Sequence, residues 1–501
     1  MISVRGLGAR RIAGRPGGRS DPFGAARGPF PDILPRMVPD SPPIASRDDA
    51  LEPLAAGRFP AAFRFGAATA AYQIEGAVRE GGRGMSIWDR FSHAPGKVAD
   101  GDTGDVACDH YHRLPADLDL LVELGLDDYR FSIAWPRVMP SGRGAVEPRG
   151  LDFYERLVDG CLERGITPVA TLYHWDLPGA LDRAGGWRDR GTAEAFADYA
   201  NVVVERLGDR VRRFATFNEP WCSAVLGHLV GVHAPGRTDL DETLAVIHHQ
   251  SLAHGLGVQA MRAARSDLEL GIVFNAHAVH PAEDTDASIA ASERFDAFHN
   301  GAFLGPVFDG AYPGAMVDAL GDRMPEGFEG DLATIRQPLD WWGLNFYKPA
   351  RIDAAPDAPW PHAAERDAPA SVPRTDIGWE IEPASFTELL TRLDARHDLP
   401  PCFITENGAC YNDGPGPDGR VRDAARIDYL DGHLAAVADA IDAGVDVRGY
   451  FVWSLMDNFE WAEGYRMRFG IVHVDYGTQA RTVKDSGRWF RDFVREARRP
   501  A

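Results

Sequence analysis

Residues 193–220 read AEAFADYANVVVERLGDRVRRFATFNEP, and this stretch contains the repeating unit from which the architecture follows. In its first part, residues 193–208, apolar side chains recur at a period near that of a helix, which predicts a helix. Its last part, residues 212–220, is a short aromatic and β-branched run that ends in Asn-Glu-Pro. Such a run predicts a strand that passes directly into a loop.

Seven further runs of the same kind occur, with helical stretches such as 115–125 and 151–165 between them. The seven runs cover residues 63–70, 127–133, 167–175, 268–277, 340–347, 401–408 and 447–455. Strands that alternate with helices predict βα units and a parallel sheet. Eight such units predict an α/β fold of a single domain, the closed (β/α)₈ or TIM barrel. A doubly wound sheet is the alternative, although no GxGxxG motif follows the first run.

Composition disfavours several classes of protein. The 501 residues include 53 Lys+Arg against 74 Asp+Glu, a net charge of −21. Binding to double-stranded nucleic acid needs basic residues that neutralise phosphates, so we expect no nucleic-acid partner. No run of about 18 apolar residues occurs, so we expect no membrane span. Five cysteines without a CxxC pair are typical of a reducing compartment, which predicts a cytoplasmic protein.

The N-terminal residues differ from the rest of the chain. Residues 1–36 contain seven Arg against two Asp, with seven Gly and five Pro. A segment of this composition buries too little apolar surface to offset its ordering entropy, so we predict a disordered tail over 1–57 and one folded domain over 58–497. Arg10-Arg11 is not followed by the apolar stretch of an export signal. We therefore favour a tail without a targeting role, or a translation start at Met37, over an export signal.

Two glutamates fall where an apolar run meets its loop: Glu219 in TFNEP and Glu406 in ITENG, each beside an asparagine. In a (β/α)₈ barrel all strand C-termini meet at one mouth, and carboxylates there are usually catalytic. Two facing carboxylates, one protonated and one ionised, are what acetal hydrolysis requires. Arg130, in the second run, is a candidate for holding one of them ionised, although it could equally serve as a partner for another acid.

Other run ends carry side chains suited to a sugar. Amide, imidazole and carboxylate groups can hydrogen-bond hydroxyls, and indole faces can pack on pyranose rings. The residues concerned are Gln73, His174, Trp175, Asn345, Tyr347, Trp453, Glu460 and Trp461. Two histidine groups, one around Asp109 to His112 and one from His248 to His254, match no metal-site spacing and are interpreted as structural. We expect neither a metal nor a cofactor.

Seven strings, in order, carry a resemblance to a known family. They are FGAATAAYQIEGA (65–77), RFSIAWPR (130–137), LYHWDLP (172–178), TFNEPW (216–221), GLNFY (343–347), ITENG (404–408) and the long string over 453–476. From about Arg58 to Val494 the chain resembles glycoside hydrolase family 1, the retaining β-glucosidase family. The resemblance implies a (β/α)₈ barrel and a two-step retaining mechanism without a cofactor.

The resemblance also implies roles for single residues. The glutamate of the NEP string is the family's acid/base and that of the ITENG string its nucleophile, which implies these roles for Glu219 and Glu406. Arg130 falls on the position of the nucleophile's electrostatic partner, and Tyr347 on a position hydrogen-bonded to the nucleophile. The implied substrate-binding residues are Gln73, His174, Trp175, Asn218, Asn345, Trp379, Trp453, Glu460, Trp461 and Phe469.

We therefore expect an exo-acting β-glucosidase, with β-galactosides and β-fucosides as further candidate substrates and a carboxyl separation of roughly 5 Å. Glu460 stands where relatives that cleave phosphorylated sugars have serine, which favours an uncharged sugar. A transglycosylase of the same fold and a non-catalytic sugar-binding barrel are the alternatives. The leaving group depends on the loops 349–383 and 223–240, for which the sequence offers no rule, and the oligomeric state stays open.

Overall fold

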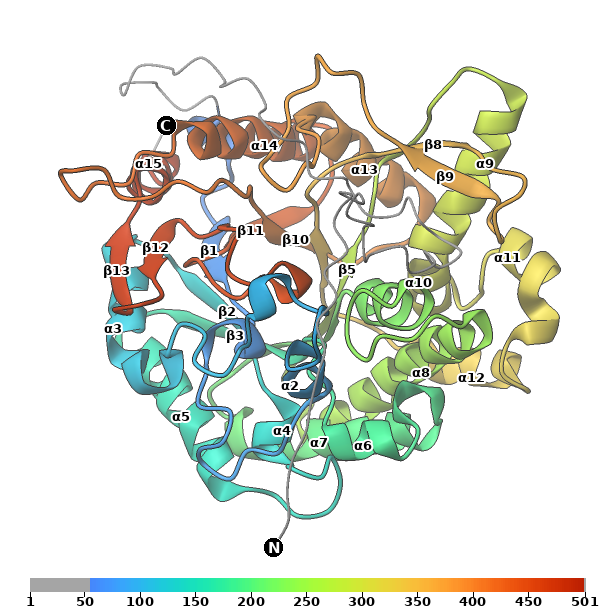
Figure 1. Ribbon diagram of the computed structural model, residues 1–501, viewed down its shortest axis with the longest axis horizontal. Coiled ribbons are helices and arrows are strands. Elements are labelled where there is room, and N and C mark those ends of the chain that lie inside the picture. Colours follow the sequence, from blue (N-terminus) through green and yellow to red (C-terminus); the bar gives the residue numbers. More distant parts are fainter. Residues whose placement is uncertain (1–54, 500–501) are drawn as a thin grey trace, which may run out of the picture.

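The structure, a computed structural model, describes residues 55–499. Eight parallel strands close into a barrel in the order β1-β11-β10-β7-β5-β4-β3-β2 (Figure 1). Because β1 pairs with both β2 and β11, the sheet has no free edge, and the doubly wound alternative is excluded. The strands are β1 (Arg64–Ala68), β2 (Asp128–Ser132), β3 (Thr167–Tyr173), β4 (Arg213–Asn218), β5 (Glu269–Asn275), β7 (Trp342–Asn345), β10 (Cys402–Asn407) and β11 (Val447–Trp453).

Each of the eight strands lies within one of the eight predicted runs, so the predicted barrel is confirmed. The predicted tail, residues 1–57, lies almost entirely outside the described residues and stays a prediction. No helix among residues 55–499 is long and apolar enough to cross a membrane.

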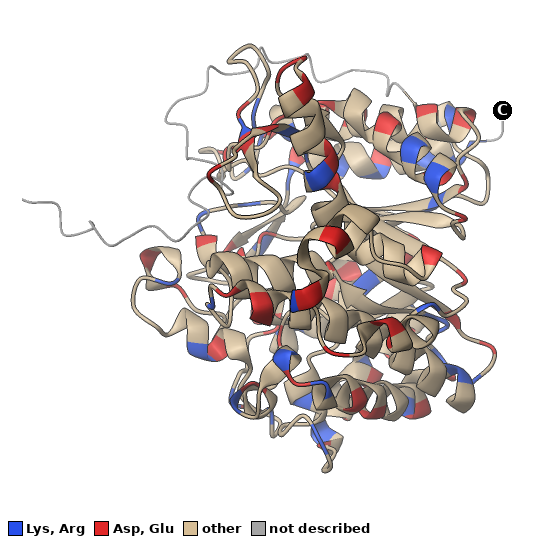
Figure 2. Ribbon diagram, turned by 90° about the vertical axis from the view of Figure 1, so that its right-hand side faces the viewer, with Lys and Arg blue, Asp and Glu red and all other residues tan. Residues whose placement is uncertain are grey.

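Helices surround the barrel (Figure 1). The longer ones are α3 (His110–Glu123), α5 (Pro148–Glu163), α7 (Gly191–Leu207), α8 (Leu240–Ala264), α9 (Asp286–Asp296), α12 (Phe328–Ile335), α13 (Pro383–Arg396), α14 (Ala424–Asp442) and α15 (Asp485–Ala497). The predicted helix over 193–208 corresponds to α7. Helix α5 begins before the predicted residue 151, because Pro148 occupies its first turn, where a missing N–H costs no hydrogen bond. Lys, Arg, Asp and Glu are spread over these outer helices, with both signs intermixed (Figure 2).

Short helical elements fill the connections. The α-helical ones are α1 (Ala71–Ile74), α2 (Ile87–Ser92), α4 (Trp135–Val138), α6 (Gly179–Arg183), α10 (Ala302–Leu304) and α11 (Gly314–Leu320). The 3₁₀ turns are η1 (Ala56–Arg58), η2 (Ala99–Gly101), η3 (Gly186–Arg188), η7 (Gly321–Arg323) and η8 (Trp461–Glu463). Three π-helical segments are η4 (Cys222–Val230), η5 (Ala297–Gly301) and η6 (Gly305–Asp309).

In the described part of the chain, two small sheets lie outside the barrel. Strands β6 (Val279–Pro281), β8 (Ala350–Ala354) and β9 (Ala363–Arg366) form one, and β12 (Val472–Asp475) with β13 (Ala480–Val483) forms the other. The segment 349–383 was predicted as a loop, but its first half forms β8 and β9. The sequence does not indicate these strands because they are short and polar, Ala-Arg-Ile-Asp-Ala in β8 and Ala-Ala-Glu-Arg in β9.

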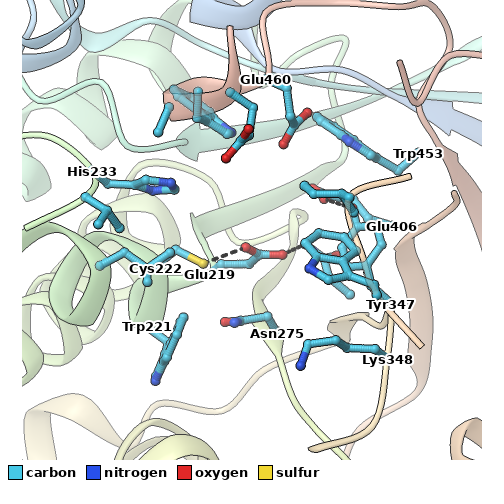
Figure 3. A pocket seen from close by; sticks show the side chains of 18 of the residues that line it. Glu219, Trp221, Cys222, His233, Asn275, Tyr347, Lys348, Glu406, Trp453 and Glu460 are labelled. Atoms are coloured by element: carbon cyan, nitrogen blue, oxygen red, sulfur yellow. Dashed lines mark hydrogen bonds between the residues drawn. The ribbon is translucent and has the colours of Figure 1, made fainter. Parts of the chain in front are cut away.

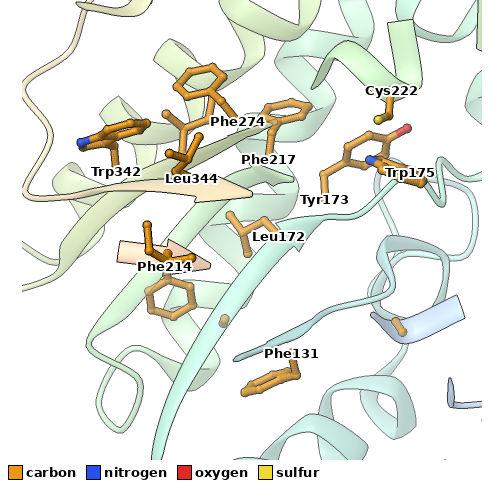
Figure 4. Packing of buried hydrophobic residues seen from close by; sticks show 14 of the residues in the cluster. Phe131, Leu172, Tyr173, Trp175, Phe214, Phe217, Cys222, Phe274, Trp342 and Leu344 are labelled. Atoms are coloured by element: carbon orange, nitrogen blue, oxygen red, sulfur yellow. The ribbon is translucent and has the colours of Figure 1, made fainter. Parts of the chain in front are cut away.

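Side chains of the strands form two layers of core. One layer packs outward under the helices; it includes Phe131, Leu172, Phe214, Phe217 and Leu344 (Figure 4). The other layer, a separate cluster, contains the smaller Val169, Ala215 and Val273. Phe214 and its neighbour Ala215 in β4 therefore belong to different layers, as side-chain alternation requires. Phe217 returns to the layer of Phe214 because β4 has one extra residue between Ala215 and Asn218.

Candidate active site

The strand register brings the predicted site residues to one level of the barrel. Ala68 in β1 is aligned with Arg130 in β2 and with Trp453 in β11. Glu406 in β10 is aligned with Asn345 in β7. Because the strands are parallel and the barrel is closed, residues far apart in sequence meet at the C-terminal mouth. A cavity of about 280 Å³ opens there and is lined by both Glu219 and Glu406.

The backbone at Glu219 is unusual. Strand β4 ends at Asn218, and Glu219 follows with φ of 44°, in the left-handed region. Its N–H donates to the Val273 carbonyl of β5 at 2.9 Å, which holds the residue beside the strand ends. Trp175 and Trp461, which line the same cavity, also have positive φ values. Left-handed backbone at non-glycine residues is costly and concentrates at functional sites.

Glu406 has charged and hydroxyl partners. Arg130 Nη1 donates to Glu406 Oε1 at 2.6 Å, and the Tyr347 hydroxyl donates to Glu406 Oε2 at 2.8 Å. Arg130 is itself buried, and its Nη2 donates to Asn218 Oδ1 at 2.7 Å. Both oxygens of Glu406 therefore accept from fixed donors, and one donor carries a full positive charge.

Among the described residues, 55–499, Glu219 has only neutral hydrogen-bond partners. Asn345 Nδ2 donates to Glu219 Oε1 at 2.6 Å, and Cys222 Sγ donates to Glu219 Oε2 at 3.1 Å (Figure 3). Burial, followed by the nearby charge of Glu406, raises the pKa of Glu219 to about 7. Glu219 thus differs from Glu406 in lacking a cationic hydrogen-bond partner.

The two carboxyl groups titrate as a pair. Burial also raises the pKa of Glu406, but the charge and hydrogen bond of Arg130 act against that rise. One proton shared between the two groups therefore resides on Glu219, while Glu406 is ionised beside the guanidinium. This is the unequal protonation that two carboxyl groups need when one acts as acid and the other as nucleophile.

A third carboxyl group, Glu460, lines the cavity beyond this pair. Burial, then the charges of Glu406, Glu463 and Glu219, raises its pKa well above the usual range. Gln73 Nε2 donates to Glu460 Oε2 at 3.4 Å and to the Phe459 carbonyl at 2.9 Å. The side chain of Glu460 therefore lies in the cavity with one amide donor, Gln73, beside it.

Most residues predicted for the site line the cavity. They are His174, Trp175, Glu219, Asn345, Tyr347, Trp379, Glu406, Trp453, Glu460, Trp461 and Phe469. Arg130, Gln73 and Asn218 lie behind this lining and hydrogen-bond to it. Asn218 is surrounded by partners, because its Oδ1 accepts from Arg130 and Asn345 and its Nδ2 contacts His174 Nε2 at 3.1 Å.

The structure adds lining residues that the sequence analysis did not single out: Trp221, Cys222, His233, Asn275, His277, His299, Lys348 and Glu463. Asn275 and His277 stand at the end of the fifth predicted run, so the strand-end argument used for the other runs could have found them. Cys222 sits three residues after Glu219 on η4, and no sequence rule predicts a π-helix there.

The histidine groups considered for a metal have other partners. His110 Nδ1 is 2.8 Å from Asp117 Oδ2, and His254 Nδ1 is 2.7 Å from Thr216 Oγ1. Across residues 55–499, no three His, Cys, Asp or Glu side chains are grouped so as to hold a metal ion.

Comparison with known proteins identifies a family and several relatives. The family described as Glycosyl hydrolase family 1 matches residues 55–498. A β-glucosidase of Agrobacterium sp. (strain ATCC 21400) is 56% identical over 437 residues, covering 87% of this chain and 95% of the relative. A bifunctional β-D-glucosidase/β-D-fucosidase of Bifidobacterium breve is 46% identical over 457 residues. The match covers 87% of this chain and 98% of the relative.

Solved structures agree as well. The virulence factor SghA of Agrobacterium tumefaciens superposes with a TM-score of 0.86 at 54% identity, covering 88% of this chain and 98% of the other. A further structure shows SghA with its substrate analog salicin. The family 1 β-glucosidase of Thermotoga maritima has a TM-score of 0.86 at 46% identity. The match covers 88% of this chain and 98% of the other. The present chain belongs to glycosyl hydrolase family 1.

Proposed function

We propose that this glycosyl hydrolase is a retaining, exo-acting β-glucosidase that removes terminal non-reducing β-D-glucosyl residues. Glu406 is the nucleophile and Glu219 the acid/base. The observation that carries the proposal is the contrast between the two carboxyl groups. Glu406 contacts the Arg130 guanidinium at 2.6 Å, whereas Glu219 has only the neutral partners Asn345 and Cys222.

In the first step, a Glu406 oxygen attacks the anomeric carbon and the bond from that carbon to the leaving oxygen breaks. The proton of Glu219 goes to the leaving oxygen, so the leaving group departs as a neutral alcohol. The product is a glycosyl ester of Glu406, and Glu219 is now a carboxylate. Arg130 and Tyr347 hold Glu406 in position for this attack through both of its oxygens.

In the second step, the Glu219 carboxylate takes a proton from water, and the water oxygen attacks the anomeric carbon. The ester bond to Glu406 breaks, and Glu406 leaves as a carboxylate beside Arg130. Two inversions give net retention, which requires the carboxyl groups to lie roughly 5 Å apart. Both starting protonation states are then restored.

The sugar occupies the end of the cavity formed by Glu460, Trp453 and Trp461. Figure 3 shows Glu460 and Trp453 at one end and Trp221, Asn275 and Lys348 at the opposite end, with Glu219 between them. A bond protonated by Glu219 thus joins a sugar at the first end to a leaving group at the second. Trp453 offers a flat apolar face to a pyranose ring, and the carboxyl oxygens of Glu460 can accept hydrogen bonds from sugar hydroxyls.

The relatives support the choice of sugar. The Agrobacterium relative is named a β-glucosidase, and the Bifidobacterium relative is named for both glucosidase and fucosidase activity. We infer that glucose is the main glycone, with fucose and galactose as further candidates. Asn275 lies at the second end, and the ring of His277 contacts that of His299, which contacts Trp221. These polar side chains suit a sugar as leaving group, in line with a role in degrading cellulose fragments. The five cysteines are all buried and unpaired, which supports a cytoplasmic location.

The test is hydrolysis of nitrophenyl β-glucoside, followed by proton NMR of the sugar first released. We expect the β-anomer, which then mutarotates. Release of the α-anomer would contradict the retaining mechanism, and absence of turnover would favour a sugar-binding barrel. Transglycosylation is measured in the same reaction by adding an alcohol acceptor and quantifying the alkyl glucoside against free glucose.

A further inference from the structure

The two oxygens of Glu219 have partners of different chemical character. Oε1 accepts from Asn345 Nδ2 at 2.6 Å. The amide of Asn345 is fixed in this orientation because its own Oδ1 accepts from the Thr405 hydroxyl at 2.7 Å. An amide N–H can only donate, so Oε1 faces a permanent donor and is a poor place for a proton.

Oε2 faces a partner that can change its role. Cys222 Sγ lies 3.1 Å from this oxygen, and a thiol is both a weak donor and a weak acceptor. Cys222 is nearly fully buried, on the first turn of η4, and its backbone N–H donates to the Glu219 carbonyl at 3.0 Å. Backbone and side chain of Cys222 therefore both bind Glu219.

We propose that Cys222 is a positioning residue of the acid/base: its thiol directs the catalytic proton to Oε2 of Glu219 and, once that proton is transferred, stabilises the carboxylate by donating its S–H. The proposal rests on the proposed role of Glu219.

The thiol keeps its own proton throughout. Burial, then the charge of Glu219, raises the pKa of Cys222 well above its usual range. The group therefore stays S–H over the pH range in which the glutamates titrate, and it can neither act as a nucleophile nor form a cation–thiolate pair. Its remaining chemical function at this place is hydrogen bonding to Glu219.

The donated hydrogen bond favours the ionised form of Glu219 and so lowers the pKa of that carboxyl group. Other groups that face Glu219 act on it too, and they come from several elements. They are Glu406 in β10, Arg130 in β2, Tyr347 after β7 and Glu460 before η8. His174 and His233 line the same cavity, and burial lowers the pKa of each imidazole. Among residues 55–499, the hydrogen bond to Glu219 Oε2 comes from Cys222, an uncharged donor, and not from any of these groups.

The test compares Cys222→Ala, which removes the donor, with Cys222→Ser, which keeps an O–H at the same place. We measure kcat/KM for nitrophenyl β-glucoside against pH. Removal of the donor should raise the pKa of Glu219, so the alkaline limb of Cys222→Ala should move to higher pH. The serine variant should keep the limb at the wild-type position or below it.

Cys161→Ala is the matched control, because Cys161 is also buried and free but lies on α5, outside the cavity lining. It should leave the limb where it is. If Cys222→Ala changes only the height of the profile, or if Cys222→Ser moves the limb as far as alanine does, the proposal is overturned. These outcomes are separable from failure of the proposed function, which would be seen as a wild-type enzyme without glucosidase activity. If Cys222→Ala folds poorly, Cys222→Val, which also lacks the donor, takes its place and should likewise move the limb to higher pH.

Discussion

Arg130 Nη1 lies 2.6 Å from Glu406 Oε1, and both side chains are almost fully buried. A buried guanidinium needs an anion, and a buried carboxylate needs a cation, so each fixes the charge of the other. The consequence for catalysis is an ionised Glu406 at a pH where the neighbouring Glu219 keeps its proton.

Replacing Arg130 by Met should therefore remove the charge that holds Glu406 ionised. We expect kcat/KM for nitrophenyl β-glucoside to fall by about 100-fold or more, and the free energy of unfolding to fall by about 3 kcal/mol, the cost of leaving one partner of a buried pair. Arg130→Lys keeps the charge but loses the contact to Asn218. Its kcat/KM should therefore lie between those of the wild type and Arg130→Met. If kcat/KM of the Arg130→Met variant stays within threefold of wild type, the ionised state of Glu406 does not depend on this charge.

Tyr347→Phe removes one hydrogen bond to Glu406, the 2.8 Å contact to Oε2, and leaves the ring in place. Loss of this donor should raise the pKa of Glu406, because the hydrogen bond favours its ionised form. The acid limb of the pH profile should move to higher pH, and kcat should fall by about tenfold. An acid limb at the wild-type position would mean that the Tyr347 hydroxyl does not affect the pKa of Glu406. Phe469, which packs at the ring edge of Tyr347, offers the control variant Phe469→Leu, with no expected shift of the limb.

The wild-type pH profile should be bell-shaped, because activity requires Glu406 without its proton and Glu219 with one. Since the pKa of Glu219 is raised to about 7, kcat/KM should decline above about pH 7. The check is a series of initial rates between pH 4 and 9. A rate that stays constant to pH 9 is incompatible with Glu219 as the acid.

The raised pKa of Glu219 also affects stability. A carboxyl group with a pKa of about 7 in the folded state and 4.5 as its ordinary value binds its proton more tightly when folded. Its stabilising contribution is complete below pH 4.5 and is lost as the pH rises through 7. Glu219→Gln, which is neutral at every pH, should therefore raise Tm at pH 8 relative to wild type by more than it does at pH 4. An equal change at both pH values would mean that Glu219 is not protonated in the folded protein near neutral pH.

The barrel could be predicted from sequence because each strand is a separate short apolar run, and closure follows from their number. The meeting of Glu219 and Glu406 followed from the same argument, since both end a strand. The Cys222 contact could not be predicted, because it depends on the left-handed backbone at Glu219 and on the π-helical turn after it. Strands β8 and β9 were missed because both are short and polar, Ala-Arg-Ile-Asp-Ala and Ala-Ala-Glu-Arg, and so lack the apolar run by which the barrel strands were recognised.

The central claim is that Glu406 forms a covalent bond to the sugar. The most direct measurement uses a 2-deoxy-2-fluoro-β-glucoside with a dinitrophenyl leaving group, which slows release of the intermediate more than its formation. After proteolysis, mass spectrometry should find one fluoroglucosyl group on the peptide that contains ITENG, attached to Glu406, and none in Glu406→Gln. A stoichiometric label on another residue, or dinitrophenol release by wild type without any label, would contradict the account.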